Sequence, residues 1–167
     1  VGVCAVQLAK QAGARVIATC RAEGDMRVAS RAGADEVVVA DERAVERIRA
    51  LAPEGVHHIV EVALDANVET DVAVLAQGGS ITTYAANTFT PHIPFWPLVF
   101  GNVRLFFVGS DDVPVEAKVE AAKAVNQALA SGWAGFEIAA RFALDDIAQA
   151  HEFMERPTKP GRGIVGI

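Results

Sequence analysis

The chain has 167 residues, of which 51% are hydrophobic and 22% charged, and it carries a formal net charge of −6. These values are typical of one well-packed globular domain and argue against a disordered or fibrous chain. Lys and Arg are scattered among acidic residues with no basic stripe, so no nucleic-acid partner is expected. The apolar stretch Ile93–Gly101 is too short and too rich in proline to cross a bilayer. With no signal segment ahead of the first helix, we expect a cytoplasmic protein without a membrane partner.

The first predicted element is an apolar helix that starts at Gly2 and ends before Gly13, and strand Arg15–Thr19 follows it. A helix whose first turn holds a glycine can bring its backbone N–H groups and the positive end of its dipole against a pyrophosphate. The alternative is that Gly2 only allows the helix to pack closely on a strand. The two cysteines, Cys4 and Cys20, are too few for a four-thiolate zinc site and are expected to be packing residues.

Helix and strand signals then alternate along the chain. Short apolar runs predict strands at 35–40, 57–63, 80–85 and 102–109, and amphipathic stretches predict helices at 24–31, 43–51, 66–76 and 114–131. A turn at Gly78-Gly79 precedes strand 80–85, and a proline-punctuated loop covers 87–100. Helices between successive strands require parallel pairing with right-handed crossovers. The predicted fold class is therefore α/β, a doubly wound and mostly parallel sheet of the Rossmann type.

This alternation ends at Gly132. An extended stretch at 136–142, a helix at 147–154, a loop at 157–163 and a short strand at 164–167 follow. We therefore predict two parts, a dinucleotide-binding domain at 1–132 and a C-terminal segment at 133–167 that belongs to a neighbouring domain.

Four motifs together carry a family resemblance. They are the opening segment from Gly2 through Ala5-Val6-Gln7-Leu8-Ala9-Lys10 and Gly13-Ala14 to Val16-Ile17-Ala18-Thr19, then Ala32-Gly33-Ala34-Asp35, Gly78-Gly79, and the tail Phe142–Glu152 with Gly161-Arg162-Gly163-Ile164-Val165. The chain resembles the cofactor domain of medium-chain dehydrogenases/reductases, and within them it is most similar to the zinc-free NADPH:quinone oxidoreductases. The resemblance implies that the sheet lacks its first, central strand. It also implies that only Val1-Gly2 remains of the family's Gly-rich turn. It also implies that residues 133–167 return to the substrate domain.

The candidate cofactor residues lie where the predicted strands and the first helix end or begin. Gly2, with the adjoining Val3, would contact the pyrophosphate. Thr19 and Arg21 follow the strand where the adenosine ribose would lie, and a guanidinium without a strand-end acid suits the 2′-phosphate of NADP(H). Glu23 is close by, and a solvated Arg21 is the alternative. The resemblance implies further cofactor contacts, largely through the backbone, at Val62, Ala63, Tyr84, Phe107, Val108 and Gly109. For Tyr84, simple packing with a surface hydroxyl is the alternative.

The loop Thr88–Phe100 contains Phe89, Phe95, Trp96 and Phe100 among three prolines. These aromatic side chains could form an apolar wall for a flat quinone, or they could contact another domain or a second subunit. The sequence contains no recognisable nucleophile set and no paired carboxylates, and we predict no catalytic side chain because the cofactor carries hydride chemistry. The histidines His57, His58, His92 and His151 lack metal-ligand spacing, so no metal site is predicted in this chain.

The most specific hypothesis is the cofactor-binding portion of an NADPH-dependent oxidoreductase that transfers hydride to a small apolar quinone or enone. The alternatives are part of a zinc-dependent alcohol dehydrogenase and a non-catalytic module that binds nucleotide or self-associates. Strand Asn102–Gly109 is apolar and last in the doubly wound series. It is therefore expected at the sheet edge, where it could join two copies into a homodimer.

Overall fold

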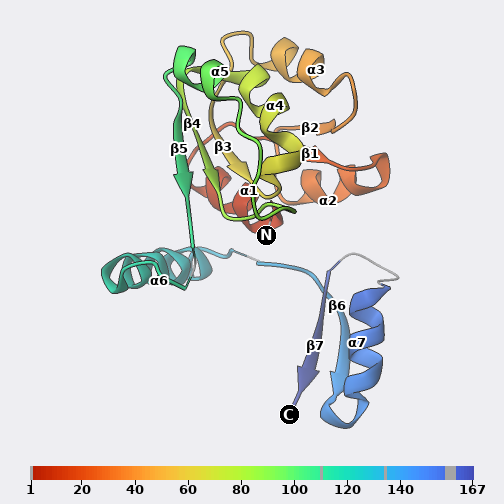
Figure 1. Ribbon diagram of the computed structural model, residues 1–167. Helices are drawn as coiled ribbons and strands as arrows, with labels where there is room; N and C mark the ends of the chain where they lie inside the picture. The colour runs from red at the N-terminus through yellow and green to blue at the C-terminus, as the bar shows by residue number, and fades with distance from the viewer. Residues whose placement is uncertain (1, 110, 134, 157–160) are drawn as a thin grey trace.

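The computed structural model describes residues 2–109, 111–133, 135–156 and 161–167. Its first part alternates helices and strands, as Figure 1 shows. The elements in chain order are α1 (Gly2–Gln11), β1 (Ile17–Cys20), η1 (Glu23–Asp25), α2 (Met26–Arg31), β2 (Glu36–Val39), α3 (Ala44–Leu51), β3 (Val56–Glu61), α4 (Leu64–Val74), β4 (Leu75–Thr83), α5 (Phe95–Phe100) and β5 (Arg104–Phe107). The remaining elements are α6 (Val115–Ala130), β6 (Ile138–Ala143), η2 (Leu144–Asp146), α7 (Ile147–Glu155) and β7 (Arg162–Gly166).

All strand pairs in the described residues are parallel. Strand β1 pairs with β2, and β3, β4 and β5 form a three-stranded sheet in that order. Strands β1 and β3 therefore each keep one edge without a hydrogen-bonded neighbour in the described chain. In a Rossmann-type sheet the first strand lies between the two strands that correspond to β1 and β3, so its absence leaves one edge of each without a neighbour. The predicted fold class is confirmed.

One apolar core holds the two sheets together. Its buried centre consists of Val38 on β2, Ala44 and Ile48 on α3, and Val74 at the end of α4. Partly buried side chains from both sheets pack against this centre, among them Ile17 on β1 and Ile59 on β3. Because α3 connects β2 to β3, its packing fixes how the two sheets sit relative to each other.

The C-terminal segment forms a separate small unit. Strand β6 pairs in parallel with β7, and α7 packs on both strands. Figure 1 shows this unit, in blue, well away from β1–β5, with α6 off to one side below β5. Trp133 makes a connection back to the first part, because its Nε1 donates a hydrogen bond of 2.7 Å to Gln7 Oε1 on α1. The predicted loop 157–163 lies mostly outside the described residues.

Two predicted boundaries were wrong. Strand β4 begins at Leu75, so Gly78-Gly79 lies inside it instead of in a preceding turn. Leu75 is buried and pairs with Val56 before the register shifts, and tertiary pairing therefore extends the strand. The predicted loop 87–100 contains helix α5, although Pro97 lies within it. Proline is tolerated in a first helical turn, where the backbone N–H has no helical acceptor.

Candidate functional site

The carboxyl end of the three-stranded sheet brings three groups of predicted residues together. Glu61, Thr83 and Phe107 are register partners across β3, β4 and β5. The residues that follow them therefore leave the sheet side by side, at one edge. They are Val62 and Ala63 after β3, Tyr84 after β4, and Val108 and Gly109 after β5. Ligands of open α/β sheets bind outside this carboxyl edge.

This edge presents apolar surface and backbone groups. Val62, Tyr84, Phe107 and Val108 are exposed large hydrophobic residues. Val108 N donates to Thr83 O, and Leu64 N donates to Ala85 O, so hydrogen bonds tie the segments after the strands to one another. Burial and the nearby Glu61 carboxylate raise the pKa of Tyr84, which keeps its hydroxyl protonated and able to donate. An apolar surface with a few polar groups suits a flat heterocycle.

Helix α1 presents its positive end without an acidic residue. Its first turn contains no Asp or Glu, and a Cβ atom at Gly2 would meet nothing within 4 Å in the described chain. The described residues therefore offer Gly2 no close packing partner, and space is open beside it. Val3 follows in the same turn. The other end of α1 is anchored, because Lys10 Nζ lies 2.8 Å from both oxygens of Asp35, and Asp35 Oδ2 accepts the Val16 N–H.

Arg21 follows β1 directly and is exposed. Within the residues that the structure describes, its guanidinium forms no hydrogen bond or ion pair. Strand β1 ends Thr19-Cys20 with no carboxylate, and Glu23 lies in η1. Burial raises the pKa of the Cys20 thiol, which also contacts Ala22 O at 3.3 Å, so this cysteine is not an activated nucleophile. Among the described residues, Arg21 is therefore an unpaired cation at the end of β1.

The aromatic residues of α5 do not lie at this edge. Helix α5 leads through Gly101 to the amino end of β5, and Gln77 near the start of β4 donates to Phe100 O at 3.0 Å. Phe95, Trp96 and Phe100 contact one another as an exposed cluster there. Figure 1 shows α5 at the opposite end of the sheet from the carboxyl edge. These three side chains therefore do not form a quinone wall at the carboxyl edge, and their contact with another domain or a second subunit stays a prediction. Phe89 is exposed in the preceding loop.

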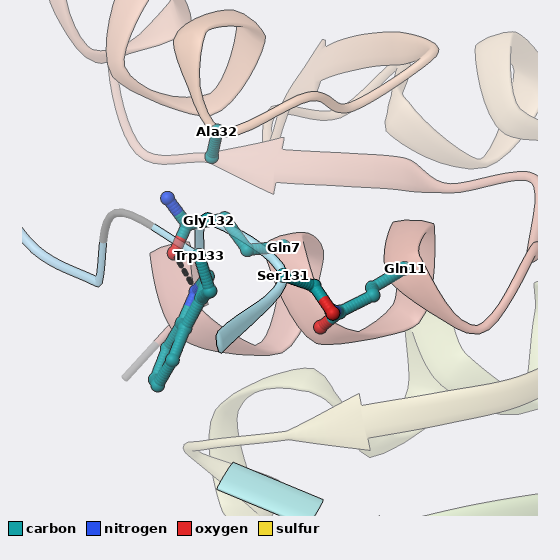
Figure 2. Close-up of a pocket in the computed structure, with 6 residues that line it drawn as sticks. All are labelled: Gln7, Gln11, Ala32, Ser131, Gly132 and Trp133. Atoms are coloured by element: carbon teal, nitrogen blue, oxygen red, sulfur yellow. Dashed lines mark hydrogen bonds between the residues drawn. The ribbon is translucent and has the colours of Figure 1, made fainter. Parts of the chain in front are cut away.

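A pocket of about 260 Å³ lies elsewhere, between α1 and the segment after α6. Figure 2 shows Gln7 and Gln11 from α1 on one side, with Trp133 and its hydrogen bond to Gln7. Ala32, Ser131 and Gly132 complete the lining. None of the predicted cofactor residues lines this pocket, and it does not define the candidate site.

Sequence reasoning missed a buried acidic pair beneath the carboxyl edge. Glu61 ends β3 and is 5% exposed, and Asp71 on α4 is 6% exposed. Glu61 Oε1 accepts the Ala63 N–H at 2.5 Å and the Asn67 side-chain amide at 2.9 Å. Burial, followed by the Glu61 charge, raises the pKa of Asp71 to about 8. The sequence signal that could have revealed this pair is the acidic residue within the apolar run Ile59-Val60-Glu61-Val62.

The described residues offer no metal centre, since they contain no group of three or more His, Cys, Asp or Glu that could hold a metal ion. His58 instead lies 2.8 Å from Ser80 Oγ through its Nδ1 atom. Within the same residues, every helix is too short or too polar to span a membrane.

The parallel strands, the acid-free first turn of α1 and the carboxyl edge together define a Rossmann-type cofactor-binding domain. A family model described as zinc-binding dehydrogenase matches residues 1–126. The chain therefore belongs to the zinc-binding dehydrogenase family, within the medium-chain dehydrogenases/reductases, and is a dehydrogenase cofactor-binding domain. A comparison with curated proteins finds no significant match.

Solved structures agree with this fold. A mycobacterial quinone oxidoreductase superimposes with a TM-score of 0.85 at 24% identity, covering 98% of this chain and 52% of its own. An NAD-dependent alcohol dehydrogenase gives 0.79 at 23% identity, covering 99% and 47%. A mycobacterial protein solved in complex with NADPH gives 0.78 at 24%, covering 98% and 52%. The chain thus spans about half the length of these structures.

Proposed function

We propose that this chain is the cofactor-binding part of an NADPH-dependent oxidoreductase that transfers hydride to a small apolar quinone or enone. The unpaired Arg21 at the end of β1 carries the proposal. NAD-binding domains use a carboxylate near this position for the ribose 2′-hydroxyl, whereas an arginine accommodates a 2′-phosphate. The quinone oxidoreductase and the NADPH complex among the structural neighbours support the same reading.

The residues present fit such a cofactor. Gly2 and Val3 would hold the pyrophosphate against the acid-free start of α1. Thr19 and Arg21 would hold the adenosine ribose and its 2′-phosphate. The nicotinamide half would lie against Val62, Ala63 and Tyr84 and the residues from Phe107 to Gly109. When bound, the cofactor supplies the hydride, and the chain's own residues orient it and exclude water.

Cofactor titration of the intact protein that contains this chain tests the proposal. NADPH should bind more tightly than NADH, and Arg21→Ala should weaken NADPH binding selectively. A charge-assisted hydrogen bond contributes about 1.5–3 kcal/mol, which corresponds to roughly ten- to over a hundredfold in affinity. Arg31→Ala removes an exposed cation at the far end of α2 and is the matched control. Equal NADPH and NADH affinities in the unmodified protein would contradict the proposal.

A zinc-dependent alcohol dehydrogenase is the second candidate, because the matched family is described as zinc-binding dehydrogenase and the structural neighbours include an NAD-dependent alcohol dehydrogenase. The described residues contain no group of three or more potential metal ligands, so a catalytic zinc would take most of its ligands from another part of the protein. Metal analysis of the intact protein separates the two functions. Stoichiometric zinc, together with chelator-sensitive oxidation of an alcohol, would favour the second candidate. Nucleotide binding without turnover would instead favour a non-catalytic module.

A further inference from the structure

The buried pair Glu61 and Asp71 has an unequal set of hydrogen-bond partners. Glu61 Oε1 accepts from Ala63 N and from Asn67 Nδ2. Both donors reach the same oxygen, so neither of them occupies Oε2, and the Glu61 side chain also interacts with the Asp71 carboxyl group. Asp71 Oδ2 is buried and has no partner among the described residues. A buried carboxylate oxygen without a donor is costly, whereas a protonated carboxyl group can donate to a neighbouring carboxylate.

Among the described residues, no positively charged group offsets the pair. On α3, the Arg49 guanidinium bonds to Ala73 O and Leu75 O at the far end of α4, and Arg47 pairs with Asp41. On β3, His58 bonds to Ser80 of β4, and after β4 the neighbouring titratable group is Tyr84. On α4 itself, Asp65 bonds to Asn87, and Glu69 is exposed. Among the described residues, the charge that acts on the Asp71 carboxyl group is that of Glu61.

We propose that Glu61 and Asp71 share one proton, held on Asp71 and donated to Glu61, and that this proton holds the turn between β3 and α4 in place. The turn consists of residues 61–67, because Glu61 accepts from both Ala63 and Asn67. Val62 and Ala63 belong to the proposed cofactor edge, so the consequence for binding rests on the proposed function. Glu61 and Asp71 are positioning residues that act through this turn. Loss of the proton places two negative charges in one buried site, which loosens the turn.

Amide hydrogen exchange at Ala63 measures the turn directly in the intact protein. After correction for the intrinsic exchange rate, protection of this amide should fall by up to about tenfold per pH unit as the pH rises towards 8, and then level off. Asp71→Asn keeps a donor for Glu61 and removes the titration, so its protection should not depend on pH. Glu69→Gln, an exposed acid on the same helix, should behave as the unmodified protein does. Unchanged pH dependence in Asp71→Asn would overturn the proposal.

A second measurement needs no substitution. The carboxyl-carbon NMR signal of Asp71 should report a protonated acid at pH 6 and titrate near or above neutrality. A signal that is already ionised at pH 6 would overturn the proposal. Titration of NADPH at pH 6.5 and 9 distinguishes a failure of the shared-proton proposal from a failure of the proposed cofactor-binding function. Weaker binding at pH 9 in the unmodified protein, absent in Asp71→Asn, is expected. Absence of NADPH binding at both pH values, with the exchange pattern intact, would instead count against the proposed function.

Discussion

Asp71 makes the stability of the fold depend on pH. Its pKa is about 8 in the folded chain, raised by burial and by Glu61 from an ordinary value of 3.8. A folded-state pKa above the unfolded one means that the native state binds the extra proton. The contribution is fully present below about pH 4 and is lost as the pH rises through about 8. At pH 8.5, Asp71→Asn should therefore raise the free energy of unfolding by about 1–3 kcal/mol, measured by urea denaturation. A variant less stable than the unmodified protein at that pH would contradict this.

Ile81 is the residue whose truncation should destabilise the domain most clearly. It lies in β4, the middle strand of its sheet, and is 0% exposed. Ile81→Ala removes buried methyl groups and leaves a cavity, so the free energy of unfolding should fall by about 2–5 kcal/mol. Val115→Ala, at an exposed position of α6, should change it by less than about 0.5 kcal/mol. Equal losses for the two variants would show that the burial of Ile81 does not contribute to the stability of the fold.

At the scale of single elements, β5 is the exposed edge of the three-stranded sheet, as its sequence predicts. In the described residues its hydrogen-bonded neighbour is β4, on one side. We propose that this edge joins two copies into a homodimer, because Phe106, Phe107 and Val108 leave it apolar. Phe106→Lys should abolish the dimer at micromolar concentration in sedimentation, while circular dichroism stays unchanged. Leu129→Lys on α6 is the matched control, at 53% exposure against 50% for Phe106. A monomeric unmodified protein would contradict the proposal.

The turn between α3 and β3 depends on one glycine. Gly55 has a φ of +90°, and a Cβ atom there would lie 2.5 Å from the Ala76 backbone nitrogen. Gly55→Ala should therefore destabilise the fold by roughly 1–3 kcal/mol from backbone strain, with the clash against β4 adding to this value. Gly24→Ala, where a Cβ atom meets nothing within 4 Å of it, should have little effect. Thermal unfolding of the two variants compares them directly, and equal melting temperatures would be evidence against a strained turn.

At the scale of the whole molecule, the chain corresponds to only part of the structures that it resembles. It spans about half the length of its structural neighbours, and β1 and β3 keep unpaired edges within the described residues. Positioning of acceptor against cofactor supplies much of the acceleration in such reactions. We therefore predict that the purified 167-residue chain does not oxidise NADPH with a simple quinone, whereas the intact protein does. Robust turnover by the isolated chain would refute this prediction.

The sequence by itself determined the order of the elements and the set of residues at one sheet edge. Short apolar runs, helix periodicity and Gly or Pro stops are local signals, and parallel pairing then places the ends of successive strands together. Tertiary structure decided what local signals do not encode. It extended β4 back to Leu75, formed α5 at the amino end of β5, and brought Glu61 against Asp71 from two different elements. Each of these outcomes depends on pairing or burial between segments distant along the chain, and the raised pKa of Asp71 depends on desolvation that appears only when α4 packs against the sheet.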